Sequence, residues 1–194
     1  MEAILFVCLG IVFAAGAFWA RGRYASFLSQ NPENYAAGRA GQFDIRTQFN
    51  GPVKCEGVIY GPLGRISSRF EADFDCRWEG NTCIMDEVFH YDDGSVQNRA
   101  WKLVLGNDGR IRATAEDVVG EGSGVQSGDA VQLKYNLRLP EASGGHVLSV
   151  VDWMYLTPNG NIINRSQFRK FGIQVAELVA TMRPYEEDEV KKAA

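Results

Sequence analysis

Residues 70–117 read FEADFDCRWEGNTCIMDEVFHYDDGSVQNRAWKLVLGNDGRIRATAED, and this stretch decides the fold. From residue 70 to residue 79 apolar and polar side chains alternate, a period of two that is typical of a strand with one buried face. Further strand patterns follow, separated by short polar turns. We therefore expect antiparallel strands that follow one another in sequence and share one apolar face.

Two glycine-containing turns set the register of these strands. The triplets 92–94 (Asp-Asp-Gly) and 107–109 (Asn-Asp-Gly) suit three-residue hairpin loops with glycine in the left-handed conformation. Such loops pair Glu87 with Arg99 and bring Arg99 opposite Asp117. Because a one-residue slip would move the apolar side chains into water, this register is well specified. The three charged residues are thus predicted to lie side by side on the apolar face.

A charged triad on a buried face has two interpretations. Unpaired buried charges are costly and paired ones roughly break even, so the triad can be an internal ion-pair network that helps to fix the barrel. Alternatively, it can hold the polar headgroup of a ligand inside a cavity. The residue pattern leaves both interpretations open.

Strand patterns on both sides extend the sheet. Residues 167–182 fit either a helix or a closing strand, and we favour a strand because of their β-branched residues. Residues 120–124 (GEGSG) predict a flexible loop. The strands are joined by tight turns without a βαβ crossover, so we predict an all-β fold, an antiparallel meander closed into a barrel of about 8–10 strands. The additional strands are predicted at 43–49, 53–60, 131–139, 146–156 and 161–165.

The N-terminal segment is apolar enough to enter a membrane. Residues 3–20 carry no charge and are followed by Arg21 and Arg23, so residues 1–22 are predicted to form a transmembrane anchor or an uncleaved signal. A cleaved signal peptide is the competing interpretation, because the triplet 15–17 (Ala-Gly-Ala) resembles a cleavage site, and a buried core helix is a third. The two arginines favour a barrel on the cytoplasmic face.

Three further segments complete the predicted domain organisation. Residues 23–41 form a linker with a short helix, for which Asn31 is the cap and Gly38 the end. Residues 42–183 form the β-barrel domain, and residues 184–194 form a charged C-terminal tail.

The composition argues against several classes of function. A net charge of -4 without a basic stripe argues against nucleic acid as a partner. His90 and His146 lack the spacing of metal ligands, and the chain contains no Gly-x-Ser-x-Gly motif. We therefore expect no cofactor or metal, and a role as an enzyme is the less favoured interpretation.

Two cysteines form a candidate disulfide. If residues 79–80 make a two-residue turn, Cys76 lies directly opposite Cys83, close enough to bridge in an oxidising compartment. The alternative is a pair of reduced, small apolar core residues. Cys55 would remain unpaired.

Several motifs in a fixed order resemble one known family. They are MDEVFHY at 85–91 with DG at 93–94, RAW at 99–101, AEDVVG at 115–120, DWMY at 152–155, NRS at 164–166 and FG at 171–172. Together they resemble the uncharacterised bacterial family catalogued as domain of unknown function 3833, over roughly residues 43–182.

This resemblance implies a single calycin- or lipocalin-like barrel, tethered to a bacterial inner membrane on the periplasmic side, with no established activity. Many members look like lipoproteins with an acylated cysteine. Cys8 follows Leu5-Phe6-Val7, which is not a lipobox, so we expect a single spanning helix in place of a lipid anchor.

Three functions fit these predictions. We favour a membrane-anchored module that binds a small apolar or lipid-like ligand in the barrel lumen. The alternative is a structural or assembly subunit that docks on a membrane protein complex and has a lumen filled by side chains. An enzyme with Glu87 or Asp117 as general acid or base requires a carboxylate of shifted pKa that faces an open pocket. The candidate lumen residues are Glu87, Arg99, Asp117, Phe74, Trp78, Phe89, Trp101, Tyr135 and Trp153.

Overall fold

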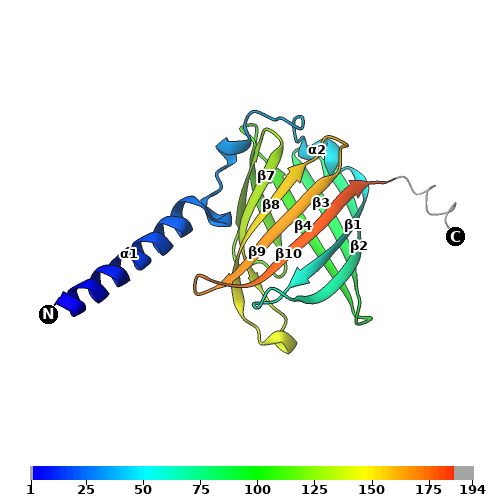
Figure 1. Cartoon of the computed structure of the whole chain (residues 1–194). Coiled ribbons are helices and arrows are strands. Elements are labelled where there is room, and N and C mark those ends of the chain that lie inside the picture. The colour runs from blue at the N-terminus through cyan, green and yellow to red at the C-terminus, as the bar shows by residue number, and fades with distance from the viewer. Residues whose placement is uncertain (1, 186–194) are drawn as a thin grey trace.

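The computed structural model describes residues 2–185 and contains a closed, ten-stranded antiparallel barrel that follows a long helix (Figure 1). Strands that follow one another in sequence pair with one another, and β1 pairs with β10 to close the barrel. The predicted fold class is therefore confirmed. The strands are β1 (Gly51–Tyr60), β2 (Ile66–Glu79), β3 (Thr82–Tyr91), β4 (Val96–Leu105), β5 (Arg110–Ala115), β6 (Gly122–Ser127), β7 (Ala130–Arg138), β8 (Val147–Leu156), β9 (Ile162–Lys170) and β10 (Ile173–Pro184).

The register of the central strands follows the hairpin loops. Glu87 pairs with Arg99 across β3 and β4, as the loop at 92–94 predicts. Trp101 pairs with Ala115 across β4 and β5, as the loop at 107–109 predicts. Gly94 and Gly109 have φ angles of 84° and 76°, the left-handed conformation that these turns require.

Residues 43–49 do not form the predicted first strand. They contain the short helix α2 (Ile45–Gln48), and Asp44 caps its first turn by accepting a hydrogen bond from the backbone N–H of Arg46 at 3.0 Å. Ile45 and Phe49 are four residues apart, so a helical turn buries both on one side, at 1% and 2% exposure. The alternation at 43–49 is equally compatible with this arrangement, and the cap decides between them.

Two further segments differ from the prediction. Residues 122–127, part of which was predicted as a loop, form β6, and a side chain at Gly124 would lie 2.3 Å from Leu133 Cδ2. Glycine is favoured there because a side chain would also lie 2.7 Å from the backbone O of Gln132, which cannot move aside as the end of Leu133 can. The segment predicted as one closing strand is the end of β9, a turn at Phe171-Gly172, and β10. It is β structure throughout, as favoured.

The two ends of the barrel differ. The upper end in Figure 1 is covered by α2, where the Phe43 N–H bonds to Gly128 O at 2.7 Å and Arg46 Nη1 to Gly80 O at 2.8 Å. Phe43 is fully buried beneath this cover. The lower end carries the turns β1–β2, β3–β4, β5–β6, β7–β8 and β9–β10. The β7–β8 turn contains the short 3-10 helix η3 (Glu141–Ser143), and Pro140 and Ser143 line the cavity beside it.

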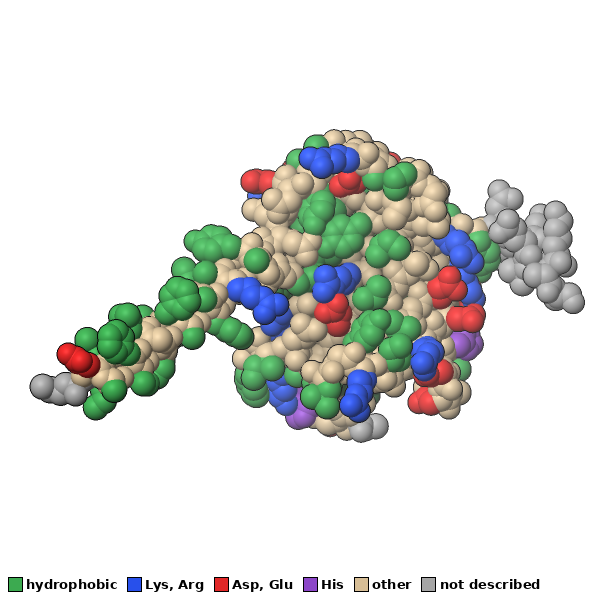
Figure 2. All heavy atoms as spheres, viewed as in Figure 1, with side chains coloured by type: hydrophobic (Ala, Val, Ile, Leu, Met, Phe, Trp, Pro, Cys, Tyr) green, Lys and Arg blue, Asp and Glu red, His purple; other side chains and the backbone are tan. Residues whose placement is uncertain are grey.

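The N-terminal segment forms the helix α1 (Glu2–Tyr24), which is long and apolar enough to cross a membrane and has none of its span buried. Figure 2 shows hydrophobic side chains along most of its length, with charged side chains only near its two ends. Such a helix fits a membrane anchor or a signal sequence, and it is not a buried core helix. Two 3-10 helices follow, η1 (Phe27–Ser29) and η2 (Pro32–Tyr35), and Asn31 caps the second as predicted. Most of the predicted charged tail, residues 186–194, lies outside the described residues.

Candidate functional site

The barrel encloses a cavity of about 620 Å³. Its walls are mainly apolar and aromatic side chains that point inward from the strands. Ile45 and Phe49 close it at the upper end, while the exposed residues Arg138 and His146 line it at the lower end. The lumen is therefore an open-mouthed pocket and is not filled by side chains.

Glu87, Arg99 and Asp117 lie together on the wall of this cavity, as their register predicts. Arg99 Nε donates a hydrogen bond to Asp117 Oδ2 at 2.7 Å, whereas Arg99 Nη1 is 3.9 Å from Glu87 Oε2. The Arg99 guanidinium also lies over the ring of Trp101, with 4.3 Å between Cζ and the ring centroid. Arg99 is thus fixed to Asp117 and Trp101 and is only loosely paired with Glu87.

Each member of this triad has one buried polar atom without a hydrogen-bond partner in the described structure. These atoms are Glu87 Oε2, Arg99 Nη2 and Asp117 Oδ1. Buried polar groups are normally hydrogen-bonded, so three unpartnered atoms in one cluster mark this part of the wall as polar and incompletely paired.

Burial raises the pKa of Glu87 to about 8. The Arg99 guanidinium opposes this shift, and the carboxylates of Asp117 and Asp152 add to it. Glu87 therefore carries a proton at neutral pH and can donate a hydrogen bond as well as accept one.

A second polar group in the cavity was not predicted. Asp152 lines it and accepts hydrogen bonds from Ser166 Oγ at 2.9 Å and from Asn164 Nδ2. Burial raises the pKa of Asp152, and these two hydrogen bonds oppose the shift. The sequence carried the signal, since the even positions Leu148, Val150, Met154 and Leu156 are apolar and Asp152 shares their parity.

Of the nine predicted lumen residues, seven line the cavity and two do not. Trp78 sits at the upper end, where its Nε1 donates to Phe49 O at 2.7 Å. Trp153 points outward from β8 and packs against Phe27 of η1. The structure thus corrects the placement of both tryptophans, while a role of the other seven in ligand contact stays a prediction. These seven are Phe74, Glu87, Phe89, Arg99, Trp101, Asp117 and Tyr135.

The two candidate disulfide cysteines are not directly opposed. The tight turn falls at residues 80–81, one residue later than predicted, so Trp78 pairs with Cys83 and Cys76 pairs with Met85. Both cysteines are buried free thiols. Cys55 is also free and buried, as the prediction of an unpaired thiol requires.

No group of three or more His, Cys, Asp or Glu side chains within residues 2–185 is arranged to hold a metal ion. The cavity thus offers hydrogen-bonding and ionisable groups on an apolar wall.

Comparison with known proteins identifies the family. Residues 23–184 match the family described as Protein of unknown function (DUF3833). The chain belongs to this family. The resemblance recognised in the motifs of this DUF3833 chain is therefore confirmed over nearly the whole barrel. No curated protein matches the chain in sequence.

The barrel of this DUF3833 chain is similar to a solved structure, the S-type phycobiliprotein lyase CPES from Guillardia theta. The TM-score is 0.57, and the match covers 81% of this chain and 99% of that one at 10% sequence identity. At this identity the likeness shows the fold, a lipocalin-like barrel.

Proposed function

We propose that the DUF3833 barrel is a binding module for a small amphipathic, lipid-like molecule. The observation that carries this proposal is the open cavity, whose mainly apolar and aromatic wall carries a cluster of ionisable side chains, among them Glu87, Arg99 and Asp117. A volume of about 620 Å³ falls within the range of ligand pockets, roughly 300–1,000 Å³. Barrels of this kind use such a lumen to hold one small ligand.

The wall determines where each part of the ligand lies. Phe74, Phe89 and Leu178 offer an apolar surface for a hydrocarbon or ring system. Glu87, Arg99 and Asp117 then meet the polar end of the molecule on the wall of the cavity. Hydrogen bonds to these side chains replace those that the headgroup makes with water.

The charge of the lumen favours one kind of headgroup. Three carboxyl groups, those of Glu87, Asp117 and Asp152, face the cavity, but Glu87 is protonated at neutral pH, and Arg99, Arg138 and Lys170 line the same cavity. The lumen therefore has no excess of negative charge, and its carboxyl oxygens suit a neutral headgroup with several O–H or N–H donors. We therefore favour a polyhydroxyl headgroup.

For its location, we propose that α1 anchors the barrel to a bacterial inner membrane. The length and apolar character of α1 support an anchor. The family resemblance favours the periplasmic face, whereas Arg21 and Arg23 favour the cytoplasmic face. A protease-protection assay on inside-out and right-side-out vesicles, with the barrel as the substrate, distinguishes the two faces.

The test of binding is native mass spectrometry of the full chain, extracted from its own membrane in mild detergent. Identification of the molecule released on denaturation gives the ligand class. Leu178→Trp fills the cavity and should abolish the bound mass, whereas Val179→Trp, on the outer face of the same strand, should keep it. A protein that carries no small molecule in repeated preparations would contradict the proposal.

A second experiment tests the headgroup. The full chain is offered a glycerol monoalkyl ether and a fatty acid of equal chain length in competition, and the bound masses are compared. We expect the glycerol ether to dominate, and Asp117→Asn to weaken that preference. Preferential binding of the fatty acid would contradict the assignment of the headgroup.

Glu87 also supports a second candidate function, general acid–base catalysis. Its raised pKa and its position on an open pocket meet the condition for such a role. The same mass measurement separates the two functions, because a carrier returns its ligand unchanged. An enzyme converts the ligand on incubation, and Glu87→Gln stops the conversion.

A further inference from the structure

The exposed apolar side chains of the barrel gather at its lower end. Outside residues 2–28, every large hydrophobic side chain exposed in the described structure belongs to the turns or strand ends there. The most exposed are Phe171 at 93% and Leu63 at 85%. The upper turns carry no such residue in the described part of the chain. The full set is Leu63, Ile66, Val96, Val119, Val147, Phe171 and Ile173.

Charge divides this rim into two sectors. The β1–β2, β7–β8 and β9–β10 turns carry Arg65, Arg138, Arg169 and Lys170, none of which forms an ion pair among residues 2–185. We call these three turns the basic sector; Glu141 is the exception to its charge. The β3–β4 and β5–β6 turns carry Asp92, Asp93, Glu116 and Glu121 and form the acidic sector.

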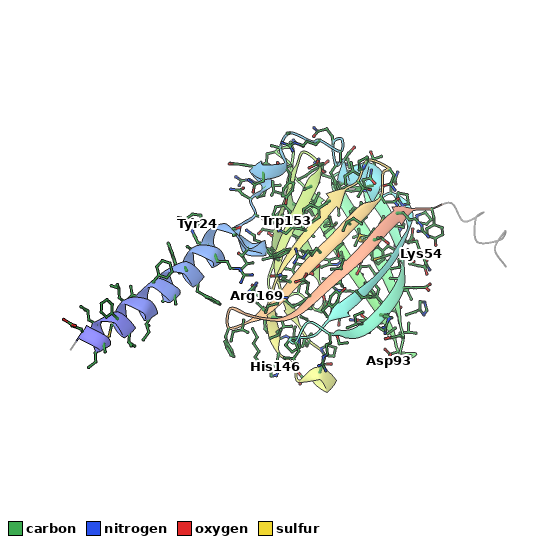
Figure 3. The ribbon with its side chains drawn as sticks, viewed as in Figure 1. Tyr24, Lys54, Asp93, His146, Trp153 and Arg169 are labelled. Atoms are coloured by element: carbon green, nitrogen blue, oxygen red, sulfur yellow. The ribbon has the colours of Figure 1, made fainter. Side chains whose placement is uncertain are left out.

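The basic sector lies on the side of the barrel to which α1 is attached. Phe27, three residues beyond the end of α1, packs against Trp153 on the outer wall of β8, and Arg165 of β9 lies over its ring at 4.9 Å. Arg169 is four residues further down β9, or about 13 Å at the usual rise of a strand. Figure 3 shows Arg169 and His146 toward the side of α1 and Asp93 away from it.

The mouth of the cavity opens at the same sector. Arg138, His146 and Lys170 line the cavity and belong to these turns, and Lys170 Nζ lies 5.6 Å above the ring of the exposed Phe171. Apolar side chains interspersed with unpaired cations are suited to the surface of an anionic bilayer, where the former enter the headgroup region and the latter attract the lipid charge.

We propose that the basic sector docks on the surface of an anionic lipid bilayer and holds the mouth of the barrel against the lipid. Phe171, Ile173 and Leu63 enter the interface, and Arg65, Arg138 and Lys170 contact the anionic headgroups. The short connection between α1 and Phe27 keeps this sector near the membrane that α1 spans. The docking does not depend on the proposed function. A further step, in which the ligand passes directly between the bilayer and the lumen, rests on the proposed function.

The test uses the full chain reconstituted in nanodiscs with lipids brominated on their acyl chains, which quench nearby tryptophans. Phe171→Trp places a reporter in the basic sector, and Val96→Trp places a matched reporter at the same end in the acidic sector. With an anionic lipid fraction present, we expect Phe171→Trp to show strong additional quenching relative to the unsubstituted chain, and Val96→Trp to show little. Equal quenching of the two reporters, or none at position 171, would overturn the proposal.

A charge series tests the lipid specificity. In the Phe171→Trp background, Arg65→Gln or Arg138→Gln should lower the ratio of docked to undocked barrel about five-fold each. Arg110→Gln, at the upper end, should leave this ratio unchanged. Docking that is as strong in purely zwitterionic nanodiscs, or that is insensitive to Arg65→Gln and Arg138→Gln, would refute an anionic surface as the partner. Because the readout is quenching, it remains valid even if no ligand is found in the lumen.

Discussion

Arg99 is the residue on which the polar wall of the lumen depends. It is hydrogen-bonded to Asp117, stacked on Trp101 and close to Glu87, and its side chain is 16% exposed. Replacing one partner of a buried ion pair leaves the other charge uncompensated, which is costly.

We therefore predict that Arg99→Met lowers the free energy of unfolding by about 3 kcal/mol, the lower part of the range for buried pairs, because Asp117 retains some contact with solvent. Thermal unfolding of the full chain in nanodiscs, followed by circular dichroism, measures the change. Arg77→Met is the matched control, since Arg77 pairs with Asp75 and Asp86 on the exposed outer wall and such pairs contribute little. Equal losses in the two variants would contradict a buried triad.

The raised pKa of Glu87 predicts how the free energy of unfolding changes with pH. Its pKa is about 8 in the folded protein and 4.5 when unperturbed, so between these values the folded state holds a proton that the unfolded state has lost. The stability that Glu87 contributes is thus complete below pH 4.5 and is lost as the pH rises toward 8, by up to about 1.4 kcal/mol per pH unit.

The measurement is the melting temperature from pH 5 to pH 8 for the unsubstituted chain and for Glu87→Gln. We expect the decline with rising pH to be smaller in the variant, because the amide does not titrate. Parallel curves would show that Glu87 is not responsible.

For single residues, the sequence predicts which residues pair across neighbouring strands better than it predicts which side chains point into the lumen. Glu87 and Arg99 pair as predicted because a glycine turn fixes the register of their hairpin. Asp117 reaches Arg99 from the turn that follows β5. Trp153 was predicted to line the lumen, but the alternation of β8 places it on the outer wall, where it is buried against Phe27. The same error of parity concealed Asp152.

Among the elements, α2 shows how a cap can override an alternating pattern. Asp44 accepts hydrogen bonds from the Arg46 N–H and from Thr47 Oγ1, and the short helix it begins seals the upper end. We predict that Asp44→Ala lowers the free energy of unfolding by about 1 kcal/mol, as loss of an N-cap usually does. Asp44→Asn keeps a hydrogen-bond acceptor at the cap, so its free energy of unfolding should stay close to that of the unsubstituted chain. Denaturant titration of both variants measures the two values. Similar losses in both would exclude the cap as the cause.

Strand β6 depends on glycine for a different reason, the close approach of Leu133. Gly124→Ala would place a methyl group 2.3 Å from Leu133 Cδ2 and 2.7 Å from Gln132 O, so we predict a loss of stability of about 1–3 kcal/mol from overpacking. Gly61→Ala is the control, because a methyl group there meets nothing closer than 3.8 Å. The melting temperatures of the two variants test this prediction. An unchanged melting temperature for Gly124→Ala would mean that β6 is packed less closely than described. Glycine usually indicates a loop, which is why the sequence did not reveal this strand.

For the whole molecule, strand patterns and tight turns were sufficient to predict a closed antiparallel barrel. They were not sufficient to predict its cavity. Whether a barrel is hollow depends on which end is covered and how the side chains fill the interior, and both follow from contacts between segments far apart in the chain. Two examples are the closure of the upper end by Ile45 and Phe49 in the α2 region and the packing of Trp153 against Phe27 on the outer wall.

Because α2 seals the upper end, the barrel opens only at its lower end. A ligand bound as proposed therefore enters and leaves through the same opening. A second ligand molecule can bind only after the first has dissociated. The rate at which one ligand replaces another would then equal the dissociation rate of the first ligand and would not depend on the concentration of the competitor.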